Sequence, residues 1–217
     1  VIALPEGSGF LERLRTTHGS LLNILAPELR EKTDGLLFID SAVARESDGE
    51  LRSRIEYRDV GARQSSFAYK EFLFPFGEAL PRLYYSLADI LDRESVLANF
   101  LHERKYEKGI APAPVQARGG ARVVALLCSD GVSPTLYRKQ VVMGAEVLFN
   151  LSSHAWFHNS YAMQTLGLRM AKVRAVESRR YLVLAGNVIP SFIVDPYGRL
   201  IAGSERDSEG VLQGRVY

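Results

Sequence analysis

An uninterrupted apolar run covers residues 123–127, where β-branched and aliphatic side chains follow one another without alternation. Such a run predicts a strand that is buried on both faces, as in the middle of a layered α/β fold. The run leads directly into Cys128, the only cysteine of the chain, and Asp130-Gly131 then predicts a turn. A residue at the end of a buried strand projects into the crevice where ligands usually bind. Cys128 is therefore the first candidate for chemistry, although a lone cysteine is also typical of a small buried apolar residue.

Other patterns of apolar positions predict the remaining strands and helices. Strands are predicted over residues 1–4, 35–44, 51–59, 66–70, 147–151, 181–185, 191–195 and 211–217. Helical spacing predicts segments within 10–30 and 80–102, and a long helix over 161–180. In that long helix, Leu166, Met170 and Val173 share one side, which we expect to pack on a sheet. Lys172 and Arg179 of the same helix are expected to face water.

Strands that alternate with helices indicate a layered α/β fold rather than a closed barrel. The chain has 217 residues, of which 47% are hydrophobic and 24% charged, and it contains no internal repeat or low-complexity linker. One domain spanning residues 1–217 is therefore expected.

Charge and cysteine content exclude several classes of protein. The net charge is only +2 and no basic segment is dense and long enough to follow phosphates, which argues against a nucleic-acid-binding protein. A single cysteine excludes an internal disulfide, and four scattered histidines form no zinc-binding pattern, so we expect no metal. No apolar run reaches the roughly 20 residues that span a bilayer.

Two further reactive side chains lie at or just past predicted strand ends, as Cys128 does. Glu6 follows the first strand, and Lys70 ends the strand that precedes a loop rich in Phe, Pro and Gly. A cysteine nucleophile needs a base that removes its proton, and an acyl-transfer intermediate needs donors for its oxyanion. Glu6, Lys70 and the backbone N–H of Ser129 can meet these needs without a histidine.

The residues around these positions resemble the nitrilase superfamily, and most closely the nitrilase-like domain of the apolipoprotein N-acyltransferases. The matching segments are residues 4–6, 69–70, 74–81, 127–128, 150–157, 170–179 and 193–201. They follow the family's order over nearly the whole chain. The motif Pro-Phe-Gly-Glu at 75–78, shortly after the lysine, favours the N-acyltransferase branch over amidases in general.

The resemblance implies a fold and a set of roles. The implied fold is a four-layer α-β-β-α sandwich whose first strand is missing from this chain, and the implied protein is a longer membrane protein of which residues 1–217 are a fragment. Glu6 is implied as the general base and Lys70 as the ammonium that stabilises the tetrahedral intermediate. Cys128 is implied as the nucleophile that becomes an acyl thioester.

Further roles follow from the same resemblance. Glu78 corresponds to the second carboxylate that this branch places near the lysine, and Trp156 and Phe157 are expected to line the acyl pocket. The chain departs from the family directly after the nucleophile, where Tyr and Glu are usual and this sequence has Ser129 and Asp130. The first change removes an aromatic ring beside the thiol, and the second shortens a carboxylate.

The function implied is transfer of an acyl chain from a phospholipid to a lipoprotein-like amine, without a cofactor. The implied location is the bacterial inner membrane, with this domain on the periplasmic side and near the membrane surface. Two alternatives stay open: an amidase-type carbon-nitrogen hydrolase, and a divergent non-enzymatic relative that serves conjugative transfer. The joint presence of Glu6, Lys70 and Cys128 favours an enzyme, because a scaffold has no physical need for all three.

Overall fold

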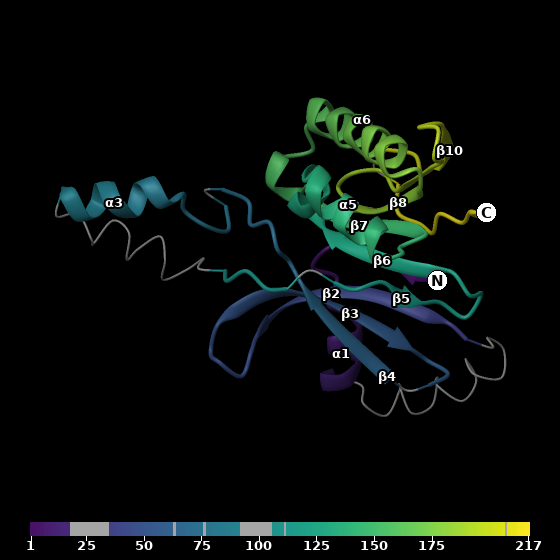
Figure 1. The fold of residues 1–217 in the computed structure, drawn as a ribbon, viewed down its shortest axis with the longest axis horizontal. Coiled ribbons are helices and arrows are strands. Elements are labelled where there is room, and N and C mark those ends of the chain that lie inside the picture. The colour runs from purple at the N-terminus through teal and green to yellow at the C-terminus, as the bar shows by residue number, and fades with distance from the viewer. Residues whose placement is uncertain (18–34, 63, 76, 92–105, 111, 207) are drawn as a thin grey trace.

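The computed structural model describes residues 1–17, 35–62, 64–75, 77–91, 106–110, 112–206 and 208–217. They form two β-sheets packed face to face, with helices on the outer face of each sheet (Figure 1). Helix α1 (Phe10–Thr17) covers the first sheet, and helices α5 (Pro134–Val142) and α6 (Tyr161–Ser178) cover the second. The four-layer α-β-β-α sandwich predicted from the sequence is confirmed. The helical segments predicted within 18–30 and 92–102 lie outside the described residues.

The two sheets differ in strand direction. The first sheet has the order β1-β2-β3-β4, formed by β1 (Ile2–Ala3), β2 (Leu37–Arg45), β3 (Leu51–Asp59) and β4 (Gln64–Tyr69). The second has the order β10-β9-β8-β7-β6-β5, formed by β5 (Val115–Gln116), β6 (Arg122–Leu127), β7 (Val147–Ser153), β8 (Tyr181–Asn187), β9 (Phe192–Val194) and β10 (Leu200–Gly203). Strands β6, β7 and β8 pair in parallel, so their carboxyl ends meet at one edge of the sheet.

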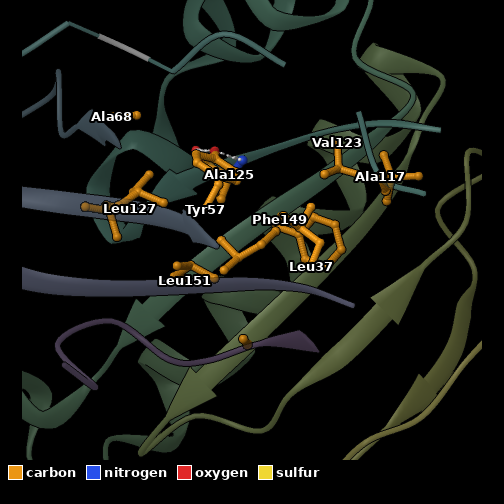
Figure 2. Packing of buried hydrophobic residues seen from close by; sticks show 13 residues of the cluster. Leu37, Tyr57, Ala68, Ala117, Val123, Ala125, Leu127, Phe149 and Leu151 are labelled. Carbon is orange, nitrogen blue, oxygen red and sulfur yellow. Dashed lines mark hydrogen bonds between the residues drawn. The ribbon is translucent and has the colours of Figure 1, made fainter. Parts of the chain in front are cut away.

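The apolar run of β6 is buried on both faces, as predicted. Val123, Ala125 and Leu127 point into the core between the two sheets, whereas Val124 and Leu126 point into the core under the helices. This division follows from the two-residue period of a strand. Figure 2 shows the core between the sheets, where Tyr57 of β3 reaches across to β6. Its hydroxyl accepts the N–H of Ala125 at 2.8 Å, which ties one sheet to the other.

Helix α6 forms where the sequence predicts it, but the predicted packing side is wrong. Leu166 and Val173 are 46% and 48% exposed, and Met170 is half-buried. The side chains buried against the sheet are Gln164, Ala171, Ala175 and Ser178. Lys172 is half-buried and Arg179 is exposed. Large side chains of β8 and β9 already fill the core under α6, so small helix residues allow the close approach that dense packing needs.

The end of the chain also differs from the prediction. Residues 211–217 form no strand, and the edge strand beside β9 is β10, which was not predicted. Within this tail, Val216 packs against the core between the sheets. The turn between β9 and β10 is held by Asp195, whose carboxylate accepts the N–H groups of Tyr197 and Arg199 at 2.9 and 2.8 Å.

Helix α3 (Arg82–Ile90) stands away from the sandwich (Figure 1). Its side chains Leu83, Leu87 and Ile90 are 65%, 41% and 77% exposed. We call this element the projecting helix. Among the described residues, no helix is long and apolar enough to cross a membrane.

Candidate active site

Three strand ends meet at one edge of the sandwich and bring Glu6, Lys70 and Cys128 together. Glu6 follows β1, Lys70 follows β4 and Cys128 follows β6. All three line one cavity of about 430 Å³. Glu78 lines the same cavity, so the structure places both carboxylates and the lysine named from the sequence around the cysteine.

Cys128 occupies a sharp turn between β6 and the 3-10 helix η1 (Cys128–Val132). Its φ angle is 38°, in the left-handed region that residues other than glycine rarely adopt. Strained backbone of this kind is concentrated at functional sites. The turn is followed at once by α5, whose first N–H groups include that of Leu136, which donates to the Ser133 hydroxyl at 3.4 Å. The cysteine is thus fixed between a buried strand and a capped helix.

The thiol of Cys128 is neutral at rest. Burial and the negative charge of Glu6 raise the pKa of the thiol to about 12, although the Lys70 ammonium acts in the opposite direction. The hydroxyl of Ser152 donates to the sulfur at 3.8 Å, and the sulfur lies 3.9 Å from the carbonyl oxygen of Ser153. Because few thiolates exist near pH 7, a nucleophilic attack by this sulfur requires a base that takes its proton.

The carboxylate of Glu6 is held in place in the same cavity as the thiol. The N–H of Ser153 donates to Oε2 at 3.2 Å, and Lys70 Nζ donates to Oε1 at 3.3 Å. The loop that carries Glu6 is fixed to β2, because the N–H of Gly7 donates to the Ser41 hydroxyl at 3.0 Å. Both sheets therefore contribute to the position of this carboxylate.

Lys70 lies between two carboxylates and its side chain is only 2% exposed. Its Nζ donates to Glu78 Oε1 at 2.7 Å as well as to Glu6. Burial alone lowers the pKa of Lys70, but the negative charges of Glu6 and Glu78 outweigh burial and raise it above its ordinary value. Glu78 also accepts the N–H of Phe74 at 2.8 Å. The lysine is therefore a fixed ammonium beside the sulfur across the physiological pH range.

Aromatic side chains form much of the rest of the cavity wall. Trp156 and Phe157, both in the short helix η2 (Ala155–Phe157), line the cavity. Trp156 is 65% exposed, so it lies at the mouth. Phe157 meets Phe74 edge to face, with 6.4 Å between the ring centroids. Ser129 is not among the lining residues, and its hydroxyl donates away from the cavity to the carbonyl oxygen of Phe72 at 2.7 Å.

Several residues of the site were not singled out from the sequence. Ser152 and Ser153 lie inside the matching segment at 150–157, which is a signal that could have identified them. Ser41 carries no such signal, because it contacts Gly7 across 34 positions of the chain. No cluster of three or more His, Cys, Asp or Glu side chains that could hold a metal occurs in the part of the chain that the structure describes.

Gly131 allows η1 to lie against β7. A Cβ atom at this position would overlap the side-chain amide of Asn150, which is buried on β7. We expect Gly131→Ala to lower the free energy of unfolding by roughly 1–3 kcal/mol, as overpacking typically does, and to displace Cys128. Urea unfolding measures the first effect. Gly119→Ala is the control, because an added Cβ there has no neighbour within 4 Å. Equal stability of the two variants would contradict the tight contact.

The family model of the carbon-nitrogen hydrolases matches residues 7–216. Apolipoprotein N-acyltransferase of Pseudomonas aeruginosa is 27% identical over 206 residues, which cover 88% of this chain and 38% of the relative. Apolipoprotein N-acyltransferase of Gloeobacter violaceus is 33% identical over 181 residues, which cover 81% of this chain and 32% of the relative. The chain thus spans less than two fifths of the length of either relative.

Solved structures with a similar fold include amidases. An amidase from Nesterenkonia sp. AN1, with an acetamide moiety bound covalently at its active-site cysteine, superposes with a TM-score of 0.60 at 18% identity. The superposition covers 93% of this chain and 72% of the amidase. Nit3 of Saccharomyces cerevisiae, a nitrilase-superfamily member, gives a TM-score of 0.59 at 14% identity and covers 87% of this chain and 62% of Nit3. At these identities the likeness concerns the fold.

Proposed function

Because the chain belongs to the carbon-nitrogen hydrolase family of enzymes, we propose that it transfers an acyl group through a thioester on Cys128. Glu6 is the proposed general base, and Lys70 is the proposed cation for the tetrahedral intermediate. The observation that carries the proposal is the shared cavity, in which Lys70 Nζ lies 3.3 Å from Glu6 Oε1 next to the neutral thiol.

The proposed acylation begins when the sulfur of Cys128 attacks an ester carbonyl while Glu6 takes the thiol proton. The carbonyl oxygen becomes an oxyanion that the Lys70 ammonium stabilises. The Ser129 backbone N–H, named from the sequence as a second donor, is left out of this step because Ser129 does not line the cavity. The intermediate then expels the alcohol, which receives the proton from Glu6, and a thioester remains. An amine attacks the thioester in the second half, again with Glu6 as base, and the thiol is regenerated.

We further propose a phospholipid as the acyl donor and a lipoprotein-like amine as the acceptor. Three features support a lipid donor: the aromatic mouth of the cavity, the exposed rings of Phe72 and Phe74, and the apolar projecting helix. The curated relatives are named apolipoprotein N-acyltransferases. In this proposal residues 1–217 are one domain of a longer protein, placed at the periplasmic face of the bacterial inner membrane.

A carbon-nitrogen hydrolase is the second candidate, because amidases share the fold. The two functions share the thioester and differ in what attacks it. The full-length protein should be incubated with a labelled phospholipid and a peptide that carries a free N-terminal amine. An N-acylated peptide supports the transferase. Release of free fatty acid at an equal rate with and without the peptide, or cleavage of simple amides alone, supports the hydrolase instead.

The projecting helix should matter for lipid donors only. A leucine-sized side chain that leaves water contributes ~1.5–3 kcal/mol, so Leu83→Glu with Ile90→Glu should weaken binding to phospholipid vesicles at least about tenfold. Acylation by a short soluble ester should stay unchanged. Leu166→Glu with Val173→Glu on α6 is the control, since these are also exposed large apolar side chains, at 46% and 48%. An equal loss with both donors would contradict a lipid-binding role.

A further inference from the structure

Ser129 and Asp130 lie buried directly after Cys128, the proposed nucleophile. Their side chains face the segment that follows Lys70, and the residues are 4% and 1% exposed. Neither side chain lines the cavity. A buried carboxylate is costly unless its oxygens are hydrogen-bonded, so the partners of Asp130 indicate what it does.

The Asp130 carboxylate connects the neighbours of two site residues. Its Oδ1 accepts the N–H of Phe72 at 2.6 Å and the N–H of Glu71 at 3.2 Å, and Glu71 directly follows Lys70. Its Oδ2 accepts the N–H of Leu127 at 3.2 Å, and Leu127 directly precedes Cys128. The Asp130 side chain thus links the backbone directly after Lys70 to the backbone directly before Cys128.

Ser129 adds a second connection to the same segment. Its hydroxyl donates to the carbonyl oxygen of Phe72 at 2.7 Å, so both the N–H and the C=O of Phe72 are held from η1. We call Ser129 and Asp130 the clamp. The carboxylates that hold the Lys70 ammonium are those of Glu6 and Glu78, which lie on loops outside η1. The clamp thus links the Lys70 segment directly to the Cys128 turn through hydrogen bonds.

We propose that Ser129 and Asp130 are positioning residues that fix the Lys70 ammonium relative to the Cys128 sulfur. The inference rests on the proposed function, in which the ammonium must meet the oxyanion that forms at Cys128. A displacement of about 1 Å can cost on the order of 10²-fold in rate.

Asp130 acts in this role as a carboxylate. Burial raises the pKa of Asp130 to about 6, while the N–H groups of Phe72 and Leu127, the nearby Lys70 and the N–H of Glu71 oppose the rise. The phenol of Tyr137 on α5 also faces it, and burial keeps that phenol neutral. At pH 7 the carboxyl group of Asp130 is therefore ionised.

The test uses the reactivity of Cys128 itself, so it does not depend on any acyl donor. Cys128 is the only cysteine of residues 1–217, and iodoacetamide alkylation read by mass spectrometry of the Cys128 peptide therefore reports this site alone. A nearby cation lowers a thiol pKa by roughly one unit or more, so Lys70→Met should slow alkylation at fixed pH about tenfold. Ser129→Ala and Asp130→Asn should each slow it roughly threefold to tenfold. Because the clamp acts through Lys70, Asp130→Asn should have no further effect when Lys70 is already Met.

Three results would contradict the positioning role of Ser129 and Asp130. The first is a wild-type alkylation rate in both Ser129→Ala and Asp130→Asn, and the second is an unchanged rate in Lys70→Met. The third is a double variant Asp130→Asn/Lys70→Met that is slower than Lys70→Met alone. Lys139→Gln is the matched control, because it removes the exposed ion pair with Glu71 on the same segment and leaves the clamp intact. Its alkylation rate should equal that of the wild type. Circular dichroism checks folding, and Ser129→Ala serves as the milder variant if Asp130→Asn unfolds. If the alkylation rates agree with the positioning role but the protein transfers no acyl group, the proposed function is wrong and the positioning role stands.

Discussion

Glu6→Gln is expected to slow acylation of Cys128 by roughly 10²–10⁴-fold, the range typical of a lost general base. The reason is the neutral thiol, whose pKa is about 12. The substitution also removes the negative charge that raises this pKa, which works against the loss, so the base must outweigh the charge. Single-turnover acylation, followed by mass spectrometry of the protein, measures the rate directly.

The pH dependence separates these two effects of Glu6→Gln. Without a base the sulfur reacts only as thiolate, and below its pKa the thiolate fraction rises about tenfold per pH unit. The variant should therefore gain rate steeply between pH 7 and 9, whereas the wild type should gain less. A variant that acylates at the wild-type rate at pH 7 would show that Glu6 is not the base.

Lys70→Met should reduce acylation by roughly 10²–10³-fold, the loss typical when one oxyanion donor is removed. It should also destabilise the fold, because it leaves Glu6 and Glu78 facing each other without the cation between them. Stability and chemistry can be separated with the double variant Lys70→Met/Glu78→Gln, which removes one negative charge together with the positive one.

The double variant should recover part of the thermal stability but none of the acylation rate. Thermal unfolding and single-turnover acylation on the same samples give both values. Recovery of acylation along with stability would indicate that Lys70 acts only as a structural counter-ion, and the oxyanion role would be wrong.

Local pattern predicted those parts of the fold that depend on neighbours in sequence. The run at 123–127 indicates a strand buried on both faces, and β6 is buried in this way between two cores. Glu6, Lys70 and Cys128 could be named because each follows a strand end, and the family order of the motifs then grouped them. The geometry that joins them through one cavity could not be derived from spacing.

Features that depend on contacts between distant parts of the chain could not be predicted from the sequence. Ser41 supports the Glu6 loop from 34 positions away, and nothing in its local pattern marks it. On α6, large apolar residues occur on the outer side, whereas Ala171 and Ala175 meet the sheet. The choice of side depends on how much space β8 and β9 leave, which helical spacing does not contain.

The most direct test of the account is the mass of the protein after exposure to an acyl donor. The full-length protein and its Cys128→Ala variant should be incubated with phospholipid vesicles and with a simple ester, quenched in acid and weighed intact. The account predicts one added acyl mass on Cys128, lost on treatment with hydroxylamine, and no added mass on Cys128→Ala. A folded wild-type protein that gains no acyl mass from any of these donors, or a Cys128→Ala variant that gains the same mass, would contradict it.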